Sequence, residues 1–145
     1  MKPTTIFPPG ATIGVMGGGQ LGRMFALAAR PMGYRVHTFS PEKNGPAAQL
    51  CDHATVADYN DEAAVRRFAS EIDLLTFEFE NIPTQTIAWV AESRLVRPRD
   101  DALHIAQNRL REKGFLAGAG VPVAPLHAGQ RETRLPAAPP VHRPS

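Results

Sequence analysis

The chain has 145 residues, of which 43% are hydrophobic and 21% are charged, and its formal net charge is +2. This length predicts one domain of ordinary size with a single core. No stretch reaches the roughly 18 apolar residues of a membrane span, and the N-terminus lacks the apolar segment of a signal peptide. We therefore expect a cytoplasmic protein without a membrane partner. The lone Cys51 excludes an internal disulfide. All of the surplus positive charge comes from residues 127–145, and no basic stripe with interleaved aromatic residues indicates nucleic-acid binding.

A glycine-rich turn over residues 17–22 organises the predicted fold. A short apolar run ends in three glycines, and a helical pattern begins at once. Its apolar residues recur on one helix face: Leu21, Met24, Phe25, Ala28 and Met32. Gly17, Gly19 and Gly22 match the G-x-G-x-x-G pattern of a strand, turn and helix. Glycines let a ligand approach the main chain, and the free N–H groups at the helix start attract an anion, usually a phosphate. The motif predicts a phosphate-bearing ligand; the alternative is a turn that only lets helix and strand pack closely.

Strands and helices alternate along the rest of the chain. Strands are predicted over 34–39, 53–57, 72–77 and 95–96, and helices over 61–70, 83–92 and 100–117. This alternation predicts βαβ units in an α/β fold with a doubly wound parallel sheet. We expect an N-terminal extension over 1–10, a Rossmann-like domain over 11–99, and a helix with a linker over 100–126. Residues 127–145 are rich in proline and poor in large apolar side chains, so we expect a disordered C-terminal tail.

Two segments should meet at the carboxyl edge of this sheet, where open parallel sheets bind their ligands. One is the glycine turn, and the other follows the strand over 72–77. In an extended chain Glu78 and Glu80 point the same way, with Phe77 and Phe79 directed oppositely into packing. A carboxylate at a strand end can accept hydrogen bonds from ribose hydroxyls or from an amine. The alternative is a solvated strand end, and for Glu78 we favour the binding function.

Other polar residues give weaker signals. Gln20 can add its side-chain amide to the backbone donors of the turn, whereas the position of Arg109 alone indicates a solvated helix face. Three scattered histidines lack the spacing of metal ligands, so no metal site is predicted from them: His37, His53 and His104. No Ser/His/Asp or Cys/His constellation can be argued. A nicotinamide dinucleotide site would need an acidic residue at the end of the second strand. Glu42 only follows Pro41 in the next loop, which weakens that alternative without eliminating it.

Five segments together resemble one family, 5-(carboxyamino)imidazole ribonucleotide synthase, the ATP-grasp enzyme of bacterial and fungal purine biosynthesis. They occur in the order and spacing of that family: GGGQLGRM (17–24), PAA (46–48), VADY (56–59), FEFENI (77–82) and IAQNRLREK (105–113). The resemblance runs from about Ala11 to Pro125 and departs at Asn108, where the family often has Asp. It implies that residues 11–99 form a Rossmann-like pre-ATP-grasp domain.

The resemblance also implies an activity, that of an ATP-dependent carbon–nitrogen ligase. Such an enzyme phosphorylates bicarbonate and passes the carboxyl group to the exocyclic amine of 5-aminoimidazole ribonucleotide. The full-length family uses ATP and Mg²⁺ and is usually a homodimer. Carried over to this sequence, the resemblance assigns the phosphoribosyl part of the ribonucleotide to Gly18, Gly19, Gln20 and Leu21, with Glu78 as a polar partner. Arg109 would reach the nucleotide of ATP, and no catalytic residue is assigned in this chain.

The sequence departs from the family after Pro125 or Leu126. The family continues there with the ATP-grasp domain, which carries the lysines, the glycine-rich lid and the acidic Mg²⁺ ligands. An Arg/Pro/Ala-rich tail follows instead, of the kind that a GC-rich gene gives when it is translated out of frame. We therefore expect a truncated or frameshifted product that is folded to about residue 125, has no metal site and is catalytically incomplete. The alternatives are a stand-alone nucleotide- or NAD(P)-binding module and a non-catalytic dimerisation remnant.

Overall fold

The computed structural model describes residues 5–124, which build a five-stranded parallel sheet with the strand order β3-β2-β1-β4-β5. The strands are β1 (Thr12–Met16), β2 (Arg35–Ser40), β3 (His53–Val56), β4 (Leu74–Phe77) and β5 (Leu95–Val96). The predicted α/β fold with a doubly wound parallel sheet is thus confirmed, and each predicted strand is present with ends shifted by at most two residues. The predicted disordered tail over 127–145 lies outside the described residues.

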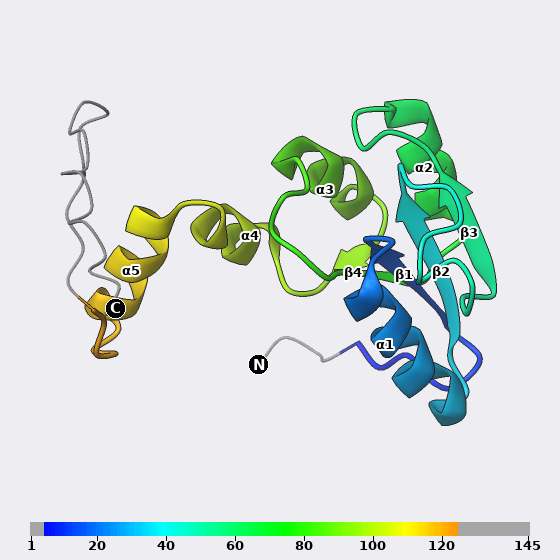
Figure 1. Ribbon diagram of the computed structural model, residues 1–145, viewed down its shortest axis with the longest axis horizontal. Helices are drawn as coiled ribbons and strands as arrows, with labels where there is room; N and C mark the ends of the chain where they lie inside the picture. Colours follow the sequence, from blue (N-terminus) through cyan, green and yellow to red (C-terminus); the bar gives the residue numbers. More distant parts are fainter. Residues whose placement is uncertain (1–4, 125–145) are drawn as a thin grey trace, which may run out of the picture.

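Helices cover both faces of the sheet (Figure 1). On one face lie α1 (Gln20–Ala29) and the short 3-10 helix η1 (Arg30–Met32), and on the other lie α2 (Glu62–Ser70) and α3 (Thr84–Ala91). Asp61 caps α2, because its carboxylate accepts a hydrogen bond from the Ala64 N–H at 3.0 Å. Gly33, with φ of 88°, ends η1 in the left-handed conformation that favours glycine.

The core lies in two layers, and α1 packs against the sheet in an unexpected orientation. Its buried residues are Gly22, Ala26 and Ala29, which are small enough for the helix backbone to approach the sheet closely. Three large apolar residues of the predicted periodic face are exposed instead: Leu21 (59%), Met24 (62%) and Met32 (60%). Phe25 is partly buried and packs against the core. The helix was predicted correctly, but most of its large apolar side chains lie outside the buried face.

The predicted helix over 100–117 is two helices, α4 (Asp100–Ala106) and α5 (Arg109–Gly118). Between them Asn108 is extended, with φ of −136°, and its side-chain oxygen accepts from the N–H groups of Leu110 and Arg111 at 3.0 and 3.1 Å. The Gln107 side chain donates to the Glu80 carbonyl at 2.9 Å and to the Ile82 carbonyl at 2.8 Å. The Asn108 cap and the hydrogen bonds of Gln107 therefore divide the predicted helix into two. Figure 1 shows α4 and α5 as an arm that extends away from the sheet.

Candidate functional site

The order of the strands creates a switch point at the centre of the sheet. The chain runs outward from β1 through β2 to β3, and then returns to the other side of β1 with β4 and β5. The loops after β1 and β4 therefore diverge at the carboxyl edge and leave a crevice, where ligands of such sheets bind. The two segments predicted to meet there do so, because the Gly19 N–H donates to Glu78 Oε1 at 2.9 Å. The Glu78 N–H in turn donates to the Met16 carbonyl at 3.2 Å.

The glycines of the turn make room for the Glu78 side chain. Gly17 has φ of 129°, a conformation that other residues rarely adopt, and a Cβ atom there would overlap the Glu78 side chain. A Cβ atom at Gly19 would lie 3.1 Å from Oε1, and one at Gly22 would lie 3.0 Å from Oε2 of the same carboxylate. The anion at the start of α1 is thus a carboxylate of the protein itself, at the place where the motif predicted a ligand phosphate.

A cavity of about 390 Å³ opens beside this carboxylate. Its lining combines main chain, two carboxylates, two hydroxyls and two aromatic rings: Gly18, Gly19, Ser40, Pro41, Glu42, Tyr59, Glu78 and Phe79. Burial, together with the nearby carboxylates, raises the pKa of Tyr59 to about 12, so its phenol stays neutral and can donate a hydrogen bond at neutral pH. The main chain at Gly18 lies close to Ser40, since a Cβ atom on Gly18 would be 2.6 Å from Ser40 Oγ.

Sequence reasoning missed Ser40 and Tyr59 as site residues. Ser40 ends β2, and Tyr59 comes three residues after the end of β3. Both therefore lie at the same carboxyl edge as the glycine turn and Glu78. The signal was available, because the rule that ligands lie beyond the carboxyl ends of parallel strands applies to every strand of the sheet.

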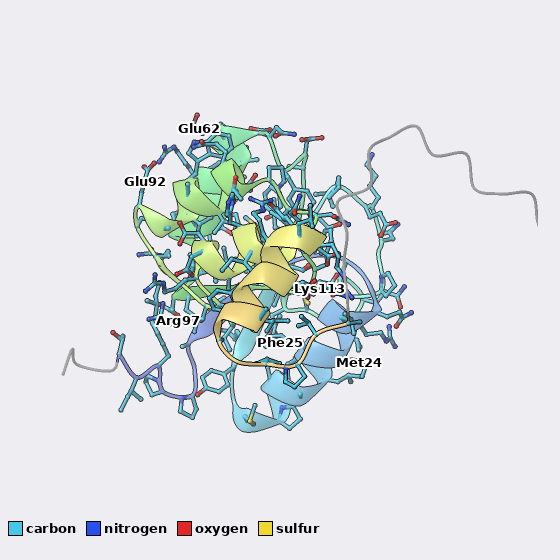
Figure 2. All side chains as sticks on the ribbon, turned by 90° about the vertical axis from the view of Figure 1, so that its left-hand side faces the viewer. Met24, Phe25, Glu62, Glu92, Arg97 and Lys113 are labelled. Carbon is cyan, nitrogen blue, oxygen red and sulfur yellow. The ribbon has the colours of Figure 1, made fainter. Side chains whose placement is uncertain are left out.

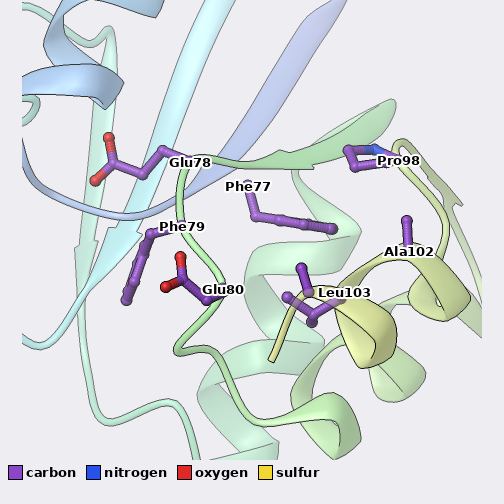
Figure 3. A pocket seen from close by; sticks show the side chains of 8 residues that line it. Phe77, Glu78, Phe79, Glu80, Pro98, Ala102 and Leu103 are labelled. Atoms are coloured by element: carbon purple, nitrogen blue, oxygen red, sulfur yellow. The ribbon is translucent and has the colours of Figure 1, made fainter. Parts of the chain in front are cut away.

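A second cavity, of about 310 Å³, lies on the other side of the segment that follows β4, between it and α4 (Figure 3). Phe77 and Phe79 pack against the larger core cluster, as predicted. The prediction that Glu78 and Glu80 point the same way assumed an extended chain, and this was wrong. The strand ends at Phe77 and the chain bends at both glutamates, so Glu80 is exposed while Glu78 lies against the glycine turn. Figure 3 shows Glu78 directed away from α4.

The remaining predicted site residues lie in two different places. Gln20 and Leu21 form the first turn of α1 beside Gly19, and the Leu21 side chain is 59% exposed. Arg109 is the first residue of α5, where its exposed guanidinium pairs with Glu112 at 2.6 Å. Because α5 and α1 are far apart in Figure 1, the structure does not bring Arg109 to the glycine turn.

The histidines and the cysteine do not extend the site. Within residues 5–124, no three His, Cys, Asp or Glu side chains are grouped so that they could hold a metal ion. Nor does any helix in this part of the chain have the length and apolar character needed to cross a membrane. His37 is buried, and burial lowers its pKa against the opposing effect of Glu71. Burial raises the pKa of the Cys51 thiol to about 11, so this thiol is protonated at neutral pH.

The sheet order, the glycine turn and the carboxylate at its helix start define a Rossmann-like domain with a candidate ligand site at the switch point. Residues 10–107 match the family model described as the ribonucleotide synthetase preATP-grasp domain. The chain belongs to this family.

The relatives identify the larger proteins in which this domain occurs. The N5-carboxyaminoimidazole ribonucleotide synthases of Brucella melitensis and Bacillus subtilis are 43% and 40% identical to the chain, with 92% and 91% of it aligned. The chain spans about 37% of the length of these curated relatives.

Solved structures agree with this assignment. An ADP complex of an N5-carboxyaminoimidazole ribonucleotide synthetase matches with a TM-score of 0.80 and 44% identity, over 85% of this chain and 33% of that one. The Aspergillus clavatus synthase in complex with ADP and 5-aminoimidazole ribonucleotide matches with a TM-score of 0.72 and 31% identity, over 81% of this chain and 31% of that one.

Proposed function

We propose that this chain is the N-terminal, ribonucleotide-binding part of an ATP-dependent ligase that carboxylates 5-aminoimidazole ribonucleotide with bicarbonate in purine biosynthesis. The observation that carries the proposal is the pairing of the glycine turn with Glu78 at the switch point. This crevice is the position at which doubly wound sheets bind nucleotides. A relative of the same fold has been solved with 5-aminoimidazole ribonucleotide and ADP bound.

In this proposal the start of α1 holds the phosphoribosyl part of the ribonucleotide. The N–H groups in the first turn of a helix have no partner within the helix, so those of Gln20 and Leu21 are available to an anion. The N–H of Gly19 is already used by Glu78, so a phosphate that also takes Gly19 must displace the carboxylate. Gly18 supplies the close main-chain approach at the wall of the cavity.

Glu78 is then the polar partner of the ligand. Its Oε1 atom is held by Gly19, whereas its Oε2 atom is buried without a hydrogen-bond partner among the described residues. An unpaired buried carboxylate oxygen is costly, and a donor from the ligand removes that cost. We assign this oxygen to a ribose hydroxyl or to the amine of the ligand. Glu42 also lines the cavity and makes it acidic. Two nearby carboxylates attract hydrogen-bond donors and repel a phosphate, so we place the phosphate at the start of α1 and the donor groups in the cavity.

The transfer chemistry of the full-length enzyme requires groups beyond this domain. We propose that ATP, bicarbonate and Mg²⁺ are its other ligands, that Arg109 contacts the ATP nucleotide, and that the enzyme is a cytoplasmic homodimer. Phosphoryl transfer depends on metal ions and fixed cations around the transferred group. The described residues offer no group of metal ligands, so no step is assigned to Mg²⁺ here. We expect the isolated chain to be catalytically incomplete.

An alternative function is binding of NAD(P), and one observation favours it. Glu42 lies in the loop directly after β2 and lines the cavity, close to the place where dinucleotide-binding domains carry the acidic residue for the adenosine ribose. Against it, residues 10–107 match a family model of ribonucleotide synthetases.

Nuclear magnetic resonance on the ¹⁵N-labelled 145-residue chain separates the two functions. We expect 5-aminoimidazole ribonucleotide to shift the amide signals of Gly18, Gly19, Gln20 and Leu21, while NADH leaves them unchanged. The variant Glu78→Gln keeps the shape of the side chain and removes its charge, so it should weaken the response. Shifts caused by NADH alone would contradict the proposed function.

A further inference from the structure

The loop between β2 and β3, residues 41–52, packs closely against the glycine turn. It consists of turns and bends without a helix or strand. The N–H of Ala47 donates to the Gly18 carbonyl at 3.0 Å, and Ala47 is fully buried. Gly45 is buried as well, and a Cβ atom there would lie 2.7 Å from the same carbonyl oxygen. The loop and the turn therefore contact each other through main-chain atoms.

The side chain of Arg23 ties this loop to α1. Its Nη1 atom donates to the Gln49 side-chain oxygen at 2.9 Å and to the Pro46 carbonyl at 3.4 Å. Figure 2 labels the two residues that follow Arg23 on α1, Met24 and Phe25, at the edge of the domain. Arg23 belongs to the glycine-rich motif of residues 17–24, but the proposed ligand site does not use it. Its hydrogen bonds instead connect the first helix with the loop.

The same loop carries Glu42, one of the two carboxylates of the cavity. The Glu42 N–H donates to Ser40 Oγ at 3.1 Å, where β2 ends. Its carboxylate lies near the glycines, since Cβ atoms on Gly18 and Gly45 would be 3.9 and 3.4 Å from Oε2. Within residues 5–124 no hydrogen bond or ion pair holds this carboxylate, so its place depends on the path of the loop.

We infer that Arg23 is a positioning residue, which fixes the loop on the glycine turn and thereby keeps the Glu42 carboxylate at the wall of the cavity. There Glu42 makes the site selective for a ligand with a single phosphate. That phosphate binds at the start of α1, and the hydroxyl or amine groups of the ligand face Glu42 and Glu78. A second phosphate would bring about 1.5 to 2 further negative charges toward two carboxylates. The inference rests on the proposed function and adds a selectivity to it.

Two ligands that differ by one phosphate test this selectivity: ribose 5-phosphate and ribose 1,5-bisphosphate. The amide signals of residues 18–21 in the ¹⁵N-labelled chain give both Kd values at low ionic strength. The quantity compared is the Kd of the bisphosphate divided by that of the monophosphate. Glu42→Gln should lower this ratio by about 5- to 10-fold, because it removes a repelling charge. Arg23→Ala should lower it by about 3-fold or more, because the loop no longer holds Glu42 in place. The amide signals of the strands verify that each variant is folded.

The direction of the change separates positioning from a direct effect of the Arg23 charge. Loss of a positive charge alone would weaken the bisphosphate more than the monophosphate and would raise the ratio. Arg23→Lys should keep the ratio, since both hydrogen bonds come from one nitrogen and an ammonium group can donate them. Arg30→Ala is the matched control and should leave the ratio unchanged. Arg30 holds only the far end of the loop, through the Leu50 carbonyl at 3.0 Å and Asp52 at 3.1 Å.

The double variant tests whether Arg23 acts through Glu42. When Glu42→Gln is already present, Arg23→Ala should not lower the ratio further. A further fall would overturn the inference, as would a ratio that Arg23→Ala leaves unchanged or raises, or that Arg30→Ala lowers equally. A parent chain that binds the bisphosphate as tightly as the monophosphate would also overturn it. These results leave the proposed function intact if 5-aminoimidazole ribonucleotide binds. A parent chain that binds neither sugar phosphate nor this ribonucleotide would overturn the proposed function, and the selectivity with it.

Discussion

The substitution Gly17→Ala should destabilise the fold strongly, through one added methyl group. Gly17 has φ of 129°, so an alanine there is strained regardless of space. Its Cβ atom would also overlap the Glu78 side chain, which must then move away from the Gly19 N–H. Backbone strain and the loss of the hydrogen bond to Glu78 therefore both destabilise the variant.

Their magnitudes follow from the structure. The backbone strain costs about 1–3 kcal/mol. The loss of a hydrogen bond to the charged carboxylate of Glu78 costs about 1.5–3 kcal/mol. The sum is about 2.5–6 kcal/mol, a large share of the stability of a small domain. At about 4 °C per kcal/mol for a domain of this size, the melting temperature should fall by about 10 °C or more.

Chemical denaturation of four proteins tests this reasoning: the parent chain, Gly17→Ala, Glu78→Ala and the double variant. Without the Glu78 side chain there is nothing for the new methyl group to displace, so Gly17→Ala should then cost only the backbone strain. We expect a coupling free energy of about 1.5–3 kcal/mol between the two positions. Gly114→Ala is the matched control, because nothing lies within 4 Å of the added Cβ atom in α5, and it should stabilise the helix by about 0.5–1 kcal/mol. A loss below about 0.5 kcal/mol for Gly17→Ala, or additive effects of the two changes, would refute the reasoning.

Three further predictions concern groups outside the glycine turn. Burial lowers the pKa of His37, so the unfolded chain takes up its proton first, and stability should fall as the pH drops below about 6.5. His37→Gln should flatten this fall in denaturation midpoints. His104→Gln, at an exposed position in α4, should not, and equal slopes for the two variants would contradict the assignment. Asn108→Ala should destabilise α5 by about 1 kcal/mol and speed amide hydrogen exchange in that helix. Asn108→Asp is the control, because aspartate keeps the cap. Unchanged exchange in Asn108→Ala would exclude the capping role. Burial raises the pKa of Cys51 to about 11, so labelling of the native thiol by a disulfide reagent should be slow at neutral pH and faster at alkaline pH. Rapid labelling at neutral pH would contradict the burial of this thiol.

The sheet could be predicted from the sequence because its signals are local. Apolar runs that end in glycine, proline or aspartate define the strands, and the chirality of the connections leaves few topologies. The packing face of α1 could not be predicted in this way. The helix carries apolar residues on both its inner and its outer face, so periodicity does not distinguish the face of Gly22, Ala26 and Ala29 from the face of Met24. Close approach to the sheet selects the small residues, and that is a tertiary effect.

The division between α4 and α5 likewise depends on contacts that are distant in sequence. Gln107 is held by the carbonyl groups of Glu80 and Ile82, and only then does the capping preference of Asn108 prevail over a continuous helix. The same limit applies to the site. Glu78 was expected at the ligand edge, but the sequence did not show that its carboxylate itself occupies the helix start. That arrangement depends on the exact path of the chain after β4.

The most direct test of the proposed function is the activity of a chimera. Residues 1–124 of this chain would replace the corresponding part of the Brucella melitensis synthase, whose sequence is 43% identical over the aligned region. We predict ADP release that depends on 5-aminoimidazole ribonucleotide and bicarbonate. The same chimera with Glu78→Gln should lose about 10- to 100-fold in kcat/KM for the ribonucleotide and keep its affinity for ADP. A folded chimera that binds ADP but releases none in response to the ribonucleotide would contradict the proposal that this domain holds that substrate.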